Sequence, residues 1–176
     1  MISLKSSLLS ALLLLLLCAV GAQAQDEQPI TWTLKLNVGA RALKAGDTFN
    51  AQATAQIKDG WHVYALTQPP NGPRPTSFTL PTAQPFKLNG LVSAPLPRST
   101  FDANFDQPTK FYEQTVTFTL PLLVAANTVA GQHQLRIVVA YQSCSRQLCF
   151  PVKKVPLTAD IKIASAPAKT RQRKKP

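Results

Sequence analysis

Residues 141–151 have the sequence YQSCSRQLCFP and contain two cysteines, Cys144 and Cys149, with four residues between them. Before this stretch, apolar residues alternate with others from Leu135 to Tyr141, which is the period of a half-buried strand. After it, residues 152–163 again have the pattern of extended chain. Two cysteines at adjoining strand ends, joined by a short loop, can come within disulfide distance with little bending of the backbone. The pair is therefore either a structural staple or a redox switch.

The rest of the sequence has the same two-residue period and no segment with the periodicity of an amphipathic helix. A turn at residues 58–60 predicts a hairpin, because Gly60 accepts the positive φ that such turns require. Two regions that contain prolines, residues 67–75 and 95–108, are expected to be irregular, since proline donates no hydrogen bond to a ladder. The sequence predicts an all-β protein, an antiparallel β-sandwich. The further strands are expected at residues 31–38, 49–57, 61–66, 77–80, 86–92 and 115–124.

The first 24 residues have the composition of a secretory signal peptide. Lys5 precedes an apolar run from Leu8 to Val20, and Ala22-Gln23-Ala24 provides the small residues of a cleavage site. A membrane anchor is the alternative, but the run is short for a span, which takes about 20 residues. Cleavage would remove Cys18 and leave an even cysteine pair in a compartment that permits disulfides. We expect an exported protein with no transmembrane segment after cleavage.

The chain of 176 residues carries a formal net charge of +11, which becomes +10 when Lys5 is removed. Its basic end, residues 164–176, has few apolar side chains to bury, so we expect a disordered tail. Basic tails can bind nucleic acid, but an exported protein meets little of it, and no nucleic-acid partner is expected. Residues 25–163 are long enough for one domain with its own core.

The sequence lacks the residues that most kinds of catalytic or metal site require. The chain has only two histidines, His62 and His133, and no serine on a Gly-x-Ser-x-Gly turn, which excludes the usual nucleophilic triad. Two cysteines and two scattered histidines do not have the spacing of zinc ligands, and no glycine-rich phosphate loop is present. We therefore expect neither a metal nor a cofactor. His62 lies inside a predicted strand and is interpreted as a surface or packing residue.

The two thiols remain as the candidate chemistry. Thiol–disulfide exchange needs an accessible thiolate and a second cysteine that resolves the mixed disulfide. Arg146, Lys153 and Lys154 are close in sequence and could favour the thiolate. A staple is the alternative, although so short a loop gains less than the roughly 3 kcal/mol expected for a loop of about 15 residues. The spacing alone leaves both interpretations open.

Three blocks of the sequence together resemble the N-terminal periplasmic domain of the DsbD thiol–disulfide interchange family. They are residues 57–64 (IKDGWHVY), residues 105–112 (FDQPTKFY) and residues 141–151. The resemblance covers residues 34–163 and implies an immunoglobulin-like sandwich with a redox-active cysteine pair at one end. It implies that Cys149 forms mixed disulfides and that Cys144 resolves them.

The resemblance also assigns aromatic residues to the active end. Phe105 corresponds to the aromatic of a cap loop that shields the pair until a partner docks. Tyr64 and Tyr141 correspond to aromatics near that end. The sequence departs from the best-known member in its shorter cysteine spacing and in Asp106, which replaces an aromatic. Its proline-rich loop at residues 68–75 is also longer.

The resemblance implies an exported thiol–disulfide oxidoreductase module that passes reducing equivalents between thioredoxin-like partners. The transmembrane and thioredoxin-like domains of the transporter are missing from this sequence, so separate thioredoxin-like or membrane redox proteins are expected to supply the electrons. The alternative is a non-catalytic β-sandwich that binds another protein, in which Cys144 and Cys149 form only a structural clip.

Overall fold

The computed structural model describes residues 28–39 and 42–165, and these residues form twelve strands and no helix. The expected signal peptide and nearly all of the expected tail lie outside the described residues, although β12 extends to Ala164, the first residue assigned to that tail. The prediction of an all-β fold is confirmed. The strands are β1 (Ile30–Asn37), β2 (Leu43–Lys44), β3 (Thr48–Ile57), β4 (His62–Tyr64), β5 (Ser77–Thr79), β6 (Phe86–Leu88), β7 (Arg98–Asp102), β8 (Gln107–Tyr112), β9 (Thr115–Val124), β10 (Gly131–Tyr141), β11 (Ser143–Cys144) and β12 (Lys153–Ala164).

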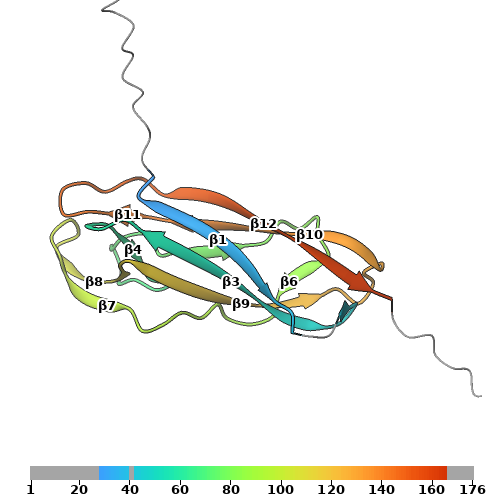
Figure 1. Cartoon of the computed structure of the whole chain (residues 1–176). Helices are drawn as coiled ribbons and strands as arrows, with labels where there is room; N and C mark the ends of the chain where they lie inside the picture. The colour runs from blue at the N-terminus through green and yellow to red at the C-terminus, as the bar shows by residue number, and fades with distance from the viewer. Residues whose placement is uncertain (1–27, 40–41, 166–176) are drawn as a thin grey trace, which may run out of the picture.

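The strands form three four-stranded sheets, in the orders β1-β3-β9-β6, β2-β12-β10-β5 and β11-β4-β8-β7. The pairings are antiparallel except for the short parallel contact between β2 and β12. The first two sheets contain the long strands of the sandwich, and the third lies at one end of it, at the left of Figure 1. The predicted antiparallel sandwich is confirmed, and the cysteine strand β11 belongs to the end sheet.

The core lies between the two large sheets and depends on a row of small residues in β3. Its alternate residues Ala51, Ala53 and Ala55 are fully buried. Ala53, for example, pairs with the large Phe118 of β9. Small residues in this central strand leave room for large side chains on both neighbouring strands, which gives the close packing that protein interiors require. Trp32 of β1 uses part of that space, with its ring 5.7 Å from that of Phe118.

One turn was predicted correctly, but the hairpin inferred from it is wrong. The Trp61 amide donates to the Lys58 carbonyl across 3.0 Å, and Gly60 has a φ of +80°. However, β3 pairs with β1 and β9, whereas β4 pairs with β8 and β11. The turn therefore carries the chain from a large sheet to the end sheet, and it does not join two neighbouring strands.

The expectation that residues 95–108 are irregular is also wrong, because β7 and β8 form a hairpin there. Their register runs from Arg98 opposite Phe111 to Asp102 opposite Gln107. Pro108 is compatible with this hairpin because β4 pairs only with the last two residues of β8, Phe111 and Tyr112. At Pro108 the strand therefore has a neighbour on one side only, which is where proline is tolerated in sheets.

The proline-rich loop at residues 67–75 forms no strand, as predicted, but it is tied to the end sheet. The Lys110 amide of β8 donates to the side chain of Gln68 across 3.1 Å. The Arg74 amide donates to the side chain of Gln142 across 2.9 Å, directly before β11. These bonds fix the loop next to both partners of β4.

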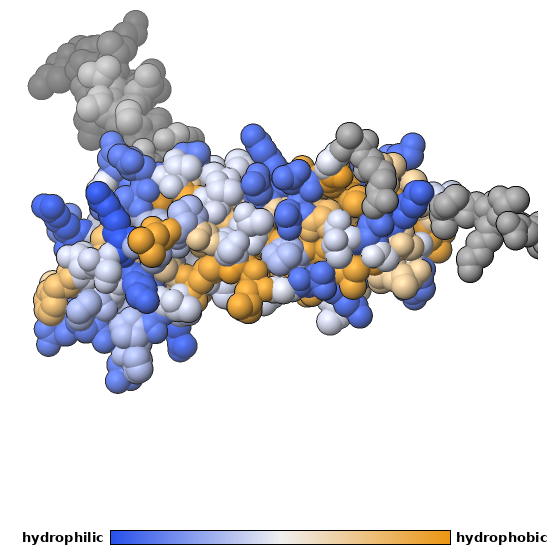
Figure 2. Space-filling view, turned by 90° about the horizontal axis from the view of Figure 1, so that it is seen from below, coloured by the Kyte–Doolittle hydropathy of each residue, from blue (hydrophilic) through white to orange (hydrophobic). Residues whose placement is uncertain are grey.

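Some apolar residues remain at the surface. On the face seen from below, they lie along the middle of the molecule, between hydrophilic residues (Figure 2). The most exposed large ones are Leu91 and Leu96, at 92% and 94%. Single exposed apolar side chains are ordinary on protein surfaces, so they do not mark a site.

Residues 28–39 and 42–165 include no helix with the length and hydrophobicity that crossing a bilayer requires.

Candidate functional site

The two cysteines form a disulfide bond at the edge of the end sheet, with their Cα atoms 4.0 Å apart. Cys144 lies in β11 and is fully buried, whereas Cys149 lies after the loop and is partly exposed. Ser145 organises the loop between them: its amide donates to the Leu148 carbonyl across 2.7 Å, and its hydroxyl accepts hydrogen bonds from the amides of Gln147 and Leu148. A short, hydrogen-bonded loop therefore joins two cysteines of unequal exposure.

The register of the end sheet gathers the polar residues of the site on one face. His62 lies opposite Cys144, and Tyr64 lies opposite Phe111. Residues directly opposite each other in an antiparallel pair project from the same face. The intervening Val63 is fully buried and belongs to the hydrophobic core. The sheet thus has one face in the core and one that can form a site.

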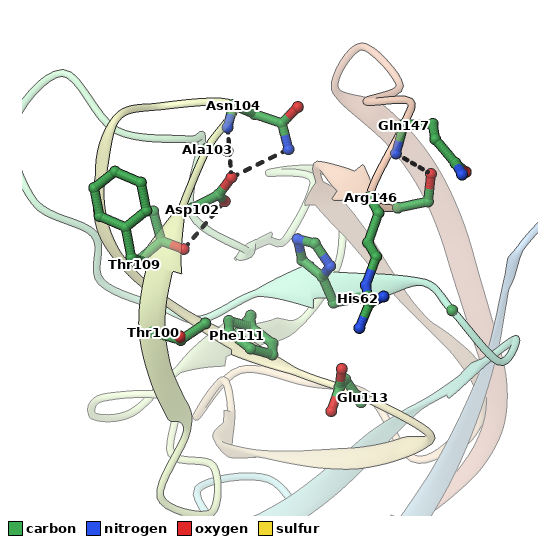
Figure 3. A pocket seen from close by; sticks show the side chains of 13 residues that line it. His62, Thr100, Asp102, Ala103, Asn104, Thr109, Phe111, Glu113, Arg146 and Gln147 are labelled. Carbon is green, nitrogen blue, oxygen red and sulfur yellow. Dashed lines mark hydrogen bonds between the residues drawn. The ribbon is translucent and has the colours of Figure 1, made fainter.

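A cavity of about 740 Å³ lies over that second face, between the β7–β8 hairpin and the cysteine loop. Figure 3 shows His62 near its middle, with Asp102 on the hairpin side and Arg146 on the loop side. Glu113, at the end of β8, also lines it and forms an ion pair with Arg98 of β7. The cavity therefore carries charges of both signs beside the disulfide loop.

Asp102 is the buried carboxylate of this face, with only 8% of its surface exposed. One carboxylate oxygen accepts hydrogen bonds from the hydroxyls of Tyr64 (2.7 Å) and Thr109 (3.2 Å). The other accepts hydrogen bonds from the backbone and side-chain nitrogens of Asn104, at 3.0 and 3.1 Å. Burial alone would raise the pKa of Asp102, but these bonds hold the pKa below its usual value. The same burial, with the bond to Asp102, raises the pKa of Tyr64. The network therefore fixes a charged carboxylate and a neutral tyrosine.

His62 packs between two aromatic rings of the same face, those of Tyr64 and Phe111, with both centroids 5.0 Å away. Its Nε2 atom is buried and has no hydrogen-bond partner among the residues the structure describes. Burial lowers the pKa of His62, and the negative charges of Asp102 and Glu113 act in the opposite direction. The interpretation of His62 as a packing residue is thus incomplete, since it also lines the cavity.

The structure brings some of the expected site residues together and separates others. Phe105 lies in the turn of the β7–β8 hairpin, and its ring meets that of Tyr64 edge-on at 5.8 Å. Tyr141 precedes the cysteine strand but lies in the core, where its ring is 5.4 Å from that of Trp32. Of the three residues proposed to promote a thiolate, Arg146 lines the cavity. The other two lie on β12, where Lys153 donates to the side chain of Gln28.

Sequence reasoning did not identify the hairpin carboxylate Asp102 or the cavity residues His62 and Glu113 as parts of a site. Each lies far along the chain from Cys144, and only the strand pairings bring them together. Among the described residues, no three His, Cys, Asp or Glu side chains are grouped so that they could hold a metal ion. The disulfide and the ionisable side chains around the cavity are the reactive groups that the structure brings together here.

The sequence matches the family model described as "Thiol:disulfide interchange protein DsbD, N-terminal" over residues 33–159. No curated protein matches it. Among solved structures, the N-terminal periplasmic domain of ScsB from Proteus mirabilis is similar, with a TM-score of 0.57 and 16% identity. That match covers 81% of this chain and 51% of the other, so this chain spans about half of that domain. The reduced form of the Neisseria meningitidis DsbD N-terminal domain gives a TM-score of 0.45 and 18% identity, covering 74% of this chain and 84% of the other.

Proposed function

Because this chain belongs to the family of N-terminal domains of the thiol:disulfide interchange protein DsbD, we propose that its Cys144–Cys149 disulfide passes reducing equivalents between thioredoxin-like partners in the periplasm. The immunoglobulin-like sandwich is the scaffold that carries this pair. Thioredoxin-like or membrane redox proteins supply and accept the electrons. Phe105 and Tyr64 complete the active end, whereas Tyr141 supports it from the core.

The observation that supports this proposal most strongly is the unequal exposure of the two cysteines. Exchange requires that a thiolate approach one sulfur of the disulfide, and that sulfur becomes the site of the mixed disulfide. Cys149 is partly exposed, whereas Cys144 is fully buried. A partner can therefore reach Cys149, while Cys144 stays in place to resolve the intermediate.

The exchange reaction balances without any further oxidant or reductant. The thiolate of a reduced partner attacks the sulfur of Cys149, and the bond between Cys149 and Cys144 breaks. Cys144 leaves with the electron pair, and a second thiolate of the partner then releases Cys149. The domain ends as a dithiol and the partner as a disulfide, and the reverse sequence delivers the electrons to an acceptor.

The proposal is tested by mixing the oxidised domain with a reduced thioredoxin and counting free thiols by alkylation and mass spectrometry. We expect both Cys144 and Cys149 to become reduced without a denaturant. A parallel sample, unfolded and reduced with dithiothreitol, gives the mass of the fully alkylated chain. If the native pair stays oxidised while the unfolded pair is reduced, the disulfide is a structural clip and the domain a protein-binding module.

Removing the ring of Phe105 is expected to increase the rate at which small thiols reduce the disulfide. The ring contacts Tyr64 at the hairpin turn and is itself partly exposed. In the proposed cap, the Phe105 ring shields the disulfide until a partner docks. The ring therefore also restricts the approach of a small thiolate to the sulfur. A Phe105→Ala variant should thus be reduced several-fold faster by glutathione. Its stability should fall by less than the about 3–5 kcal/mol typical of a fully buried phenylalanine.

Phe101→Ala is the comparison variant, because Phe101 lies on the same hairpin and also lines the cavity, but with a largely exposed side chain. Its rate of reduction should stay close to that of the unmodified domain. Equal rates for the unmodified domain and Phe105→Ala would remove Phe105 from the role of a cap.

A further inference from the structure

His62 is the ionisable side chain that the strand register places directly beside the buried cysteine. β4 and β11 pair so that His62 lies opposite Cys144. The Cβ atoms of such pairs are about 4.5–5.5 Å apart and lie on the same face. The side chains of His62 and Cys144 therefore project from the same face of two adjacent, paired strands.

The imidazole carries a polar atom that lacks a partner in the oxidised protein. Its Nε2 is buried without a hydrogen bond among the described residues. A buried polar atom of this kind is uncommon in native proteins and requires an explanation. A disulfide sulfur offers no proton to it, whereas the thiol of a reduced Cys144 would.

Ionisable side chains surround His62 both on its own strand and on the neighbouring elements. Asp102 comes from β7, Glu113 from the end of β8, Tyr64 from the same strand, and Arg146 from the cysteine loop. Burial lowers the pKa of His62 more than the two carboxylates raise it, so the imidazole is largely neutral near pH 7. A neutral imidazole can accept a proton, and the cavity beside it gives that proton a path to water (Figure 3).

We propose that His62 takes the proton from the Cys144 thiol when Cys144 resolves a mixed disulfide at Cys149. This inference rests on the proposed function. Cys144 is fully buried, and burial in apolar surroundings raises the pKa of a thiol and keeps it unreactive. An adjacent base overcomes that barrier, because only the thiolate is the nucleophile.

The step balances in atoms and electrons. The proton of the Cys144 thiol moves to the imidazole, and the resulting thiolate attacks the sulfur of Cys149. The bond between Cys149 and the partner breaks, and the partner leaves as a thiolate with the electron pair. The imidazolium of His62 then releases its proton to water in the cavity. In the opposite direction, the same imidazolium returns a proton to Cys144 as it leaves the disulfide.

The test uses the reduced domain and Ellman's reagent, a small aromatic disulfide, with no partner protein. The first thionitrobenzoate released reports attack by the exposed Cys149, and the second reports resolution by Cys144. In His62→Gln, the first phase should be unchanged and the second slower by about 100-fold near pH 7, since proton transfer by a side chain typically contributes 10²–10⁴-fold. The difference should shrink at high pH, above the raised pKa of a buried thiol, where Cys144 ionises without a base.

His133→Gln is the matched control, because His133 is the other histidine of the chain and lies on β10. Both of its phases should match those of the unmodified domain. A purely structural role for His62 would slow both phases, or slow the second equally at every pH, and either result overturns the proposal. If His62→Gln does not fold, the pH profile of the unmodified second phase still decides: a single titration at the thiol pKa contradicts a histidine base. Ellman's reagent replaces the partner, so this test remains valid even if exchange with thioredoxin fails.

Discussion

A Cys144→Ser variant is expected to accumulate a covalent complex with a thioredoxin-like protein, joined through Cys149. The partly exposed Cys149 can still attack or be attacked. The serine hydroxyl at position 144, however, cannot displace the partner from the mixed disulfide, because resolution requires a thiolate. The complex should be the main product on a non-reducing gel after mixing the reduced variant with a thioredoxin variant that keeps only its attacking cysteine, activated as a thionitrobenzoate disulfide, because neither protein then has a thiol that can resolve the complex. Dithiothreitol should release both proteins.

Cys149→Ser is the matched control for this experiment. Its remaining cysteine, Cys144, is fully buried in β11. It should therefore form little or no complex under the same conditions, although its stability is affected by the same loss of the disulfide. Equal trapping by the two variants would contradict the assignment of Cys149 as the exchanging cysteine. If neither variant traps a partner, the alternative function is favoured: a protein-binding module in which the disulfide is only a structural clip.

Replacing Asp102 by asparagine is expected to cause a large loss of stability at neutral pH. The carboxylate accepts hydrogen bonds from Tyr64, Thr109 and Asn104. Hydrogen bonds to a charged group contribute about 1.5–3 kcal/mol. The NH₂ group of an asparagine is itself a donor, so it would face the donors that now bind the carboxylate. We therefore expect the free energy of unfolding at pH 7, measured with urea, to fall by about that amount.

The loss should also depend on pH in a definite direction. The hydrogen bonds hold the pKa of Asp102 below its usual value. A carboxyl group whose pKa is lowered by folding stabilises the protein above its unfolded pKa, about 3.9 for Asp, and this contribution is lost as pH falls through the folded pKa. The difference between the unmodified domain and Asp102→Asn should thus be full at pH 7 and shrink below about pH 4.

Asp106→Asn controls for the change of charge. Asp106 lies in the same hairpin turn, is exposed, and has a φ of +52°, which asparagine also adopts. Its free energy of unfolding should change by less than about 0.5 kcal/mol, as for most surface substitutions. A loss of stability in Asp102→Asn that is the same at pH 7 and pH 3 would show that the carboxylate charge is not what the network stabilises.

The long strands could be predicted from the sequence because each has one face in the core. In β9, for example, the residues from Val116 to Val124 alternate between buried and partly exposed positions. That period of two is visible in the sequence alone. The β7–β8 hairpin was missed because its strands are short, exposed along β7 and interrupted by Pro108. Composition alone could not show that this proline lies where β8 has a neighbour on one side only.

The turn at Gly60 shows a second limit of prediction from the sequence. Turn chemistry at residues 58–60 depends on local backbone preferences, and these were interpreted correctly. Whether a turn joins neighbouring strands or carries the chain to another sheet depends on pairings with distant segments. Here β4 pairs with β8 and β11, about 50 and 80 residues further along the chain. No local pattern contains that information.

The same distinction applies to the site. The cysteine pair could be identified because the two residues lie only five positions apart in the sequence. Its surroundings could not, because Asp102 meets Tyr64 across 38 residues, and His62 meets Cys144 only through strand pairing. A histidine within a predicted strand carries no signal of its own. The signal that could have found it is the pairing of β4 with the cysteine strand.

The reduction potential of the Cys144–Cys149 disulfide tests the central claim most directly. The domain is equilibrated with glutathione or dithiothreitol buffers of known potential, and the reduced fraction is measured by alkylation. Structural disulfides of secreted proteins lie below about −300 mV, whereas labile and catalytic ones have higher potentials. An exchange-active pair predicts a value above about −300 mV, in the range of thioredoxin-like partners. A value clearly below it would mean that the disulfide is a clip and that electrons do not pass through this site.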